Sequence, residues 1–176
     1  MGSGSGISCN LSLNTALTPE QRDRYQNTQV IQDILKNSKT IAIVGLSTEP
    51  QKASNMVASY LQDEGYRIIP VNPKAESILG EKSYHDLVSI PEKVDLVDIF
   101  RPASEVQAIV EQAINIKARA IWMQLRIINF FAADKAQEAG LYAVVDKCIK
   151  MEHGRFNGGL HSAGMNTEII SARRTR

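Results

Sequence analysis

"TIAIVGLSTEPQKASNMVASYLQDEGYRIIPV", residues Thr40 to Val71, holds the pattern that decides the fold. Its first seven residues form a continuous apolar run of strand length, which is typical of a strand buried on both faces. A helical pattern follows and ends near Gly65, and a second apolar run begins at Tyr66. This order of strand, turn, helix and strand predicts a βαβ unit with two parallel strands.

Apolar runs and helical patterns alternate through the rest of the chain. Three more strands are predicted, at 94–100, 119–125 and 141–146. Two more helices are predicted, at 104–116 and 130–140. Another helix is predicted at 18–39, with Thr18 as its N-cap and Pro19 in its first turn. Together they predict an α/β domain over residues 18–156: a single doubly wound, mainly parallel five-stranded sheet with flanking helices.

The two ends of the chain differ from this domain. Residues 1–17 begin with MGSGSG and are expected to be a flexible leader, either a vector-derived remnant or a native tail. Residues 157–176 form a tail rich in small residues that ends in RRTR. We expect the charges of that tail to be solvated.

The composition of the 176 residues excludes several broad classes of protein. A hydrophobic content of 43% suits one domain with a real core, and 20 basic against 19 acidic residues leave a net charge of +1. That balance gives no reason to expect nucleic acid as a partner, and no apolar run approaches the roughly 20 residues of a membrane span. The two cysteines imply no disulfide framework and favour a reducing cytoplasm.

Ligands of such sheets bind in the segments that follow the strands. The first of these segments holds Gly45, Leu46, Ser47, Lys52 and Ser54. Glycine lets the backbone approach a ligand, Ser54 is expected to cap the next helix, and Lys52 supplies charge for an anion at the helix N-terminus. Because the G-x-G-x-x-G pattern is absent, the loop is either a phosphate cradle or a solvated turn with one glycine.

The end of the second strand narrows the choice of ligand. Val71, Asn72, Pro73 and Lys74 stand where NAD-binding domains usually carry a carboxylate for the ribose hydroxyls. Lys74 instead suits a phosphate on the ribose, and Asn72 is held extended by the proline that follows it. The pattern favours NADP or coenzyme A (CoA) over NAD; the alternative is a plain turn with a solvated lysine.

The third and fourth strand ends carry further candidates. Phe100 has two possible roles: it contacts adenine or pantetheine of the ligand, or it belongs to the core. Arg101 either binds a phosphate or is a solvated surface charge. Trp122 and Met123 are candidates for ligand contact, although such residues are more often core. Gln124, a polar residue at a strand end, is expected to form a hydrogen bond with an amide of the ligand.

Five segments of the chain, in order, resemble the small bacterial CoA-binding proteins. They are IAIVGLS, GYRIIPVNP, ILGEKSYHDLVSIPEKVDLVDIFR, IWMQL and VVDKCIKMEHGRF. The resemblance covers roughly residues 39–156 and implies a Rossmann-like domain similar to the CoA-binding domain of the succinyl-CoA synthetase alpha subunit. It implies CoA as the cofactor, held by the four sets of loop residues named above. The synthetase's catalytic histidine belongs to a second domain, for which we expect no counterpart here.

The fourth loop departs from the family's pattern. Arg126 stands where the family usually has glycine, and Phe130 and Phe131 stand where acidic residues usually open the helix. If this position needs a positive φ, arginine strains the turn, while Asn129 still caps the helix. Either these three residues line a protein–protein contact, natural or engineered, or the rings pack into the domain's own core. The change also makes a narrower ligand cleft conceivable.

Cys148 follows the fifth strand and lies within the resemblance. Lys147 and Lys150 are expected to lower the pKa of its thiol, and a mixed disulfide with CoA is one possibility; the alternative is a small buried residue. Asp98 either faces the cleft or is a structural carboxylate. No zinc spacing and no nucleophile motif occur in the sequence, so neither a catalytic nor a metal site is predicted.

These observations predict a non-catalytic module, regulatory or a carrier, that binds CoA or acyl-CoA in the cytoplasm as a homo-oligomer. One alternative is an NADP-linked oxidoreductase, against which the length of 176 residues argues. Another is an assembly protein that uses the face of Arg126, Phe130 and Phe131.

Overall fold

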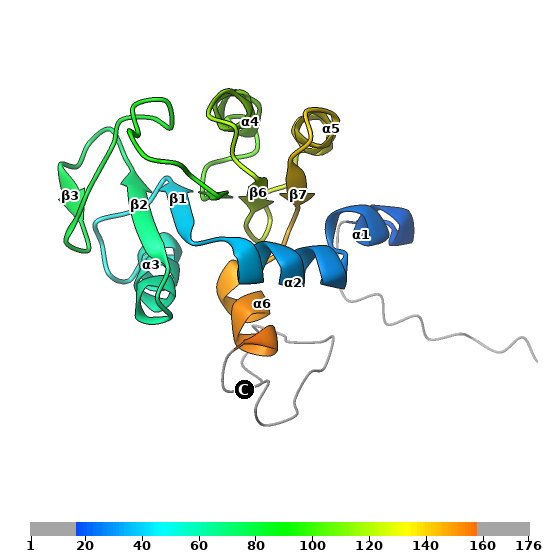
Figure 1. Cartoon of the computed structure of the whole chain (residues 1–176), viewed down its shortest axis with the longest axis horizontal. Coiled ribbons are helices and arrows are strands. Elements are labelled where there is room, and N and C mark those ends of the chain that lie inside the picture. The colour runs from blue at the N-terminus through cyan, green and yellow to red at the C-terminus, as the bar shows by residue number, and fades with distance from the viewer. Residues whose placement is uncertain (1–16, 158–176) are drawn as a thin grey trace, which may run out of the picture.

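The computed structural model describes residues 17–157 and contains a five-stranded sheet in the order β2-β1-β5-β6-β7 (Figure 1). Its strands are β1 (Thr40–Val44), β2 (Arg67–Val71), β5 (Leu96–Ile99), β6 (Ala120–Met123) and β7 (Tyr142–Val144). Every neighbouring pair in this sheet is parallel. The predicted α/β fold with a parallel five-stranded sheet is therefore confirmed.

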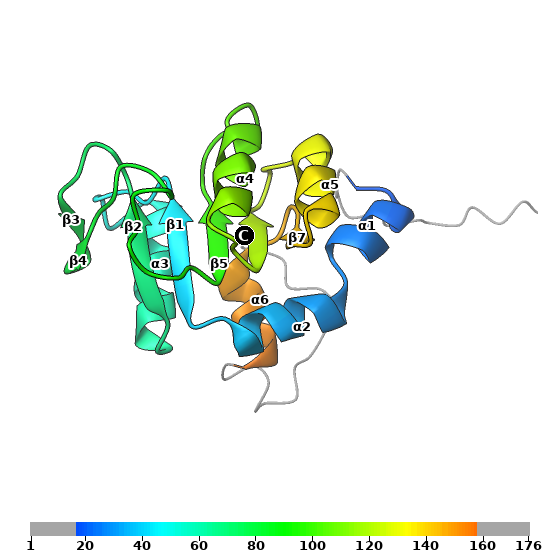
Figure 2. The ribbon, with the colours of Figure 1, turned by 45° about the horizontal axis from the view of Figure 1, so that its top comes forward.

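Helices cover both faces of the sheet. As Figures 1 and 2 show, α4 (Val106–Asn115) and α5 (Phe130–Glu138) lie on one face, and α2 (Thr28–Asn37), α3 (Ala53–Asp63) and α6 (Ile149–Phe156) lie on the other. Within residues 17–157, no helix is both long and apolar enough to cross a bilayer.

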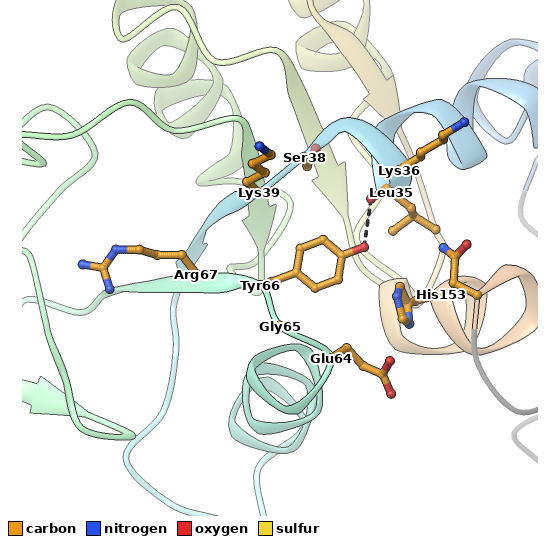
Figure 3. Close-up of a pocket in the computed structure, with 10 residues that line it drawn as sticks. Leu35, Lys36, Ser38, Lys39, Glu64, Gly65, Tyr66, Arg67 and His153 are labelled. Atoms are coloured by element: carbon orange, nitrogen blue, oxygen red, sulfur yellow. Dashed lines mark hydrogen bonds between the residues drawn. The ribbon is translucent and has the colours of Figure 1, made fainter.

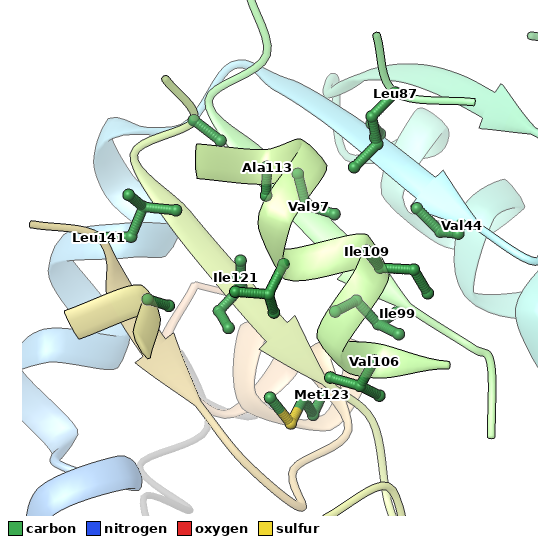
Figure 4. Packing of buried hydrophobic residues seen from close by; sticks show 14 of the residues in the cluster. Val44, Leu87, Val97, Ile99, Val106, Ile109, Ala113, Ile121, Met123 and Leu141 are labelled. Carbon is green, nitrogen blue, oxygen red and sulfur yellow. The ribbon is translucent and has the colours of Figure 1, made fainter. Parts of the chain in front are cut away.

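Each face of the sheet carries its own hydrophobic core. Val97, Ile99, Ile121 and Met123 pack under α4 on one face (Figure 4). Leu96 and Trp122, with Ile41 and Ile43, pack under the helices of the other face. Successive residues of a strand point to opposite faces, so strands covered on both sides need continuous apolar runs.

The helix expected at 18–39 is two helices, α1 (Pro19–Tyr25) and α2. The predicted N-cap is confirmed, because the Thr18 hydroxyl accepts a hydrogen bond from the Gln21 N–H. A second N-cap then starts α2: the Asn27 side chain accepts hydrogen bonds from the N–H groups of Gln29 (3.0 Å) and Val30 (3.2 Å). The single-helix prediction was wrong because Asn27 was not recognised as a cap.

Three further elements were not predicted from the sequence. They are the short antiparallel pair β3 (Ser77–Ile78) and β4 (Glu81–Lys82), and α6. The expected leader and tail fall almost wholly on residues 1–16 and 158–176, outside the described part of the chain. Leu17, at the leader's end, is buried in the domain.

The strand order of the sheet reverses between β1 and β5. The chain runs from β1 outward to β2 and then crosses to β5 on the other side of β1. The connections that leave β1 and β5 therefore diverge, which is the point where parallel sheets of this type bind ligands.

Candidate ligand-binding site

Gly45, in the loop after β1, lies against the end of β2 and the loop after β5. Its φ is +86°, and its N–H donates a hydrogen bond to the Val71 carbonyl at 3.0 Å. A Cβ at this position would lie 2.8 Å from Cδ of Arg101 and 3.2 Å from the carbonyl oxygen of Phe100. Only glycine combines this backbone angle with this close approach of two loops.

Ser54 was predicted to cap α3, and this prediction was wrong: Lys52 is the N-cap and makes no side-chain cap hydrogen bond. Ser54 lies in the first turn of α3, where its hydroxyl accepts a hydrogen bond from the Ser47 N–H at 3.0 Å. Asn55 donates from its side chain to the Ser47 carbonyl at 2.9 Å. The two side chains shape the first loop and leave the N-terminus of α3 without a side-chain cap.

Asn72 joins the second loop to the first. Its amide nitrogen donates to the Leu46 carbonyl at 2.8 Å, and its amide oxygen accepts from the Lys74 N–H at 2.9 Å. Within the described residues, neither Lys52 nor Lys74 forms an ion pair, and both are exposed. Two lysines thus flank an ordered pair of loops.

Arg101 lies in the loop after β5 and forms an ion pair with Glu105. Both carboxylate oxygens accept from the guanidinium at 2.8 Å, and this hydrogen bonding raises the pKa of Arg101. An incoming phosphate would compete with Glu105 for the same donors. Phe100 is half-buried against the core under α3 and α6.

The apolar candidates at the strand ends belong to the core. Leu46, Trp122 and Met123 have no exposed surface, and Val71 is 3% exposed. The Trp122 indole N–H donates to the Lys147 carbonyl at 2.7 Å. A ligand at this edge would reach the backbone of these residues rather than their side chains.

Gln124 was expected to form a hydrogen bond with an amide of the ligand, but its own side-chain amide forms a hydrogen bond inside the protein. It is 4% exposed and donates to Oδ1 of Asp98 at 2.8 Å. Asp98 is fully buried, and burial raises the pKa of its carboxyl group to about 7. Its second oxygen, Oδ2, has no hydrogen-bond partner among the described residues.

The expected activation of Cys148 by its lysine neighbours is not observed. The residue is the N-cap of α6, and burial, as the largest effect, raises the pKa of its thiol. The charge of Lys150 acts in the opposite direction but is outweighed, and Lys147 is paired with Glu152 at 3.2 Å. Among the described residues, no group of three or more His, Cys, Asp and Glu side chains is arranged to hold a metal ion.

Of the two phenylalanines that follow the divergent fourth loop, one packs inside the domain and the other is exposed. Arg126 has a φ of +67°, so the suspected strain is present, and its N–H donates to Oδ1 of Asp146 at 2.7 Å. Phe130 follows the second alternative: it packs against the domain's own core and stacks on Tyr25 with ring centroids 5.4 Å apart. Phe131 is 67% exposed. A protein contact through Arg126 and Phe131 stays a prediction.

Replacing each of the two phenylalanines with alanine should lower the stability of the protein by clearly different amounts. We expect Phe130→Ala to lower the free energy of unfolding by about 2 kcal/mol, because a half-buried ring that stacks on another ring is lost. Phe131→Ala should change it by less than about 0.5 kcal/mol. Urea unfolding of both variants measures the difference, and equal losses would contradict the observed packing.

A cavity of about 520 Å³ lies at the opposite edge of the sheet, at the starts of β1 and β2 (Figure 3). Tyr66, His153 and Glu64 line it, and the Tyr66 hydroxyl donates to the Leu35 carbonyl at 2.8 Å. No sequence motif pointed to it. A second hollow of about 370 Å³ runs along α3 and is lined by Pro50 and Lys150, among others.

The sheet order and the converging loops define a Rossmann-like α/β domain whose polar strand ends gather beside β1. Residues 39–154 match the family model described as "CoA binding domain". The chain belongs to this family, in agreement with the resemblance noted from its motifs.

The similar proteins include small ones and large ones. "Uncharacterized protein YneT" of Bacillus subtilis is 38% identical over 123 residues, which are 70% of this chain and 91% of YneT. A solved structure of a hypothetical protein from Pyrococcus horikoshii OT3 is 41% identical, with a TM-score of 0.71 over 73% of this chain and 90% of that one. "Acetate--CoA ligase [ADP-forming] I" of Archaeoglobus fulgidus is 36% identical over 74 residues, 42% of this chain but only 11% of the ligase.

Proposed function

We propose that the protein binds coenzyme A along the C-terminal edge of its sheet and acts as a binding module. The observation that carries this proposal is the junction at Gly45, where the loop after β1 meets the end of β2 and the loop after β5, and where a Cβ would crowd Arg101 and Phe100. Membership of the CoA-binding family supports the choice of ligand, as does similarity to part of a CoA ligase.

The charges at this edge suit a ligand with several phosphates. The N-terminus of α3 presents N–H groups and the positive end of a helix dipole to the first loop. Lys52 lies at this helix end, and Lys74 lies on the neighbouring loop. CoA carries a pyrophosphate and a separate phosphate on the ribose, so we assign the pyrophosphate to the first loop and the ribose phosphate to Lys74.

Calorimetric titration with CoA, NADP and ATP tests this choice of ligand. We expect CoA to bind and NADP to bind much more weakly. Binding of NADP alone would contradict the proposal.

Lys74 offers a sharper test, because 3′-dephospho-CoA lacks only the ribose phosphate. We expect Lys74→Ala to weaken CoA binding by about tenfold, the equivalent of about 1.4 kcal/mol, and to leave the affinity for 3′-dephospho-CoA nearly unchanged. Lys36→Ala, which removes an exposed lysine beside the cavity at the opposite edge, is the matched control. Equal losses with both ligands would show that Lys74 does not contact the ribose phosphate.

A further inference from the structure

Three basic residues were predicted to contact phosphate, and they differ in whether a carboxylate already binds them. Within the described residues, Lys52 and Lys74 form no ion pair. Arg101 forms a two-pronged pair, in which Nε and Nη2 each donate to one carboxylate oxygen of Glu105 at 2.8 Å. A phosphate binds a guanidinium through the same fork of N–H groups. Glu105 therefore occupies the donors that a phosphate of the ligand would use.

The Arg101 side chain lies directly against the first loop. A Cβ added at Gly45 would lie 2.8 Å from Cδ and 3.3 Å from Cγ of Arg101, so the aliphatic part of this side chain covers the glycine. The guanidinium is bonded to Cδ and therefore lies at the border of the loop to which the pyrophosphate is assigned. Among the phosphates of CoA, the pyrophosphate is thus the one placed to reach Arg101.

The turn between the two partners holds Glu105 in place. The Glu105 N–H donates to the Pro102 carbonyl at 2.9 Å, and the Asn129 side chain donates to the Ala103 carbonyl at 3.0 Å. Glu105 is also the N-cap of α4, but its side chain makes no cap hydrogen bond. Its carboxylate binds Arg101 instead, and this hydrogen bonding lowers the pKa of Glu105, so the pair stays charged at neutral pH.

We propose that Glu105 limits the affinity for CoA by competing with the pyrophosphate for Arg101. This inference rests on the proposed CoA binding. In the ligand-free protein Glu105 holds the guanidinium; when CoA binds, the pyrophosphate replaces the carboxylate as the acceptor, and breaking the ion pair opposes binding. Both side chains are nearly half exposed, so water screens the pair and the opposing effect is modest. Removing the charge of Glu105 should therefore strengthen binding, whereas the loss of a residue that merely supports the site would weaken it.

Calorimetric titration of Glu105→Gln with CoA tests this competition. We expect the affinity to rise about fourfold over that of the unsubstituted protein. The affinity for 3′-dephospho-CoA should rise by the same factor, because that molecule retains the pyrophosphate. Glu111→Gln is the matched control: Glu111 also lies on α4 and is ion-paired, with Lys135, and its replacement should leave the affinity unchanged. An affinity of Glu105→Gln that is equal to or below that of the unsubstituted protein would overturn the proposal.

A double substitution separates competition from plain charge repulsion between Glu105 and the ligand. Arg101→Gln alone should weaken CoA binding by about tenfold, because its charge-assisted hydrogen bonds are lost. Adding Glu105→Gln to this variant should improve the affinity less than about twofold, because the guanidinium for which the two acceptors compete is gone. A gain as large as the one seen with Arg101 present would overturn the proposal, since Glu105 would then act by repulsion alone.

The same titrations distinguish this inference from the proposal of CoA binding. If CoA binds the unsubstituted protein and Glu105→Gln binds it no more tightly, this inference fails alone. If CoA binds neither the unsubstituted protein nor Glu105→Gln, the proposed function fails, and this inference fails with it.

Discussion

Replacing Asp98 with asparagine is expected to make the protein more stable at alkaline pH, by up to roughly 4 kcal/mol near pH 8. In the folded protein, burial raises the pKa of this carboxyl to about 7 from an ordinary value of 3.8. The native state therefore retains the proton more strongly than the unfolded state. The stability of the unsubstituted protein should decline as pH rises from about 4 to about 7 and level off above that, because an unpaired buried charge must then be tolerated. Asparagine cannot ionise, so this decline should vanish in the variant.

Asp95→Asn provides a control with the opposite sign. Burial acts to raise the pKa of Asp95, but hydrogen bonds from the N–H groups of Lys39 and Thr40 outweigh it and leave the pKa lowered. Its ionised form therefore stabilises the fold at neutral pH, and this contribution is lost on acidification through the lowered pKa. Urea unfolding of both variants at about pH 4 and about pH 8 measures the two trends. If Asp98→Asn gains no stability at the higher pH, Asp98 is not the buried titrating group described here.

Replacing Gly45 with alanine is expected to weaken CoA binding by tenfold or more and to lower the free energy of unfolding by about 1–3 kcal/mol. The stability loss follows from the φ of +86°, which alanine rarely adopts, and from the approach of the new Cβ to the Phe100 carbonyl. The binding loss follows because the Arg101 side chain must move from a position 2.8 Å away, and because the methyl group occupies the meeting point of the loops.

Gly140→Ala is the matched control for backbone strain. Gly140 has a φ of +87°, nearly that of Gly45, but a Cβ there would meet nothing within 4 Å. We expect Gly140→Ala to lower the free energy of unfolding through a comparable backbone strain, and to leave the affinity for CoA, measured by calorimetry, unchanged. If the two variants lose the same affinity, the effect at Gly45 comes from general destabilisation and not from the site.

Much of the candidate site was open to prediction because its residues follow strands that are obvious in the sequence. Gly45, Asn72 and Lys74 could be placed at one edge since parallel strands end together. The partners of the polar side chains could not be predicted, because they come from distant segments. Ser54 accepts from Ser47 instead of capping its helix, and Gln124 donates to Asp98 instead of facing outward.

The sequence by itself determined the class of fold and the family. Continuous apolar runs require strands covered on both faces, and helices between them require parallel crossovers. Only the tertiary structure decided which side chains are buried and which partners they have. Phe130 and Phe131 are neighbours of the same type, yet one stacks on Tyr25 and the other is exposed. Cys148 has lysines on either side in the local sequence, yet burial governs its pKa. Burial and hydrogen-bond partners depend on the packing of segments far apart in the chain, which no local pattern records.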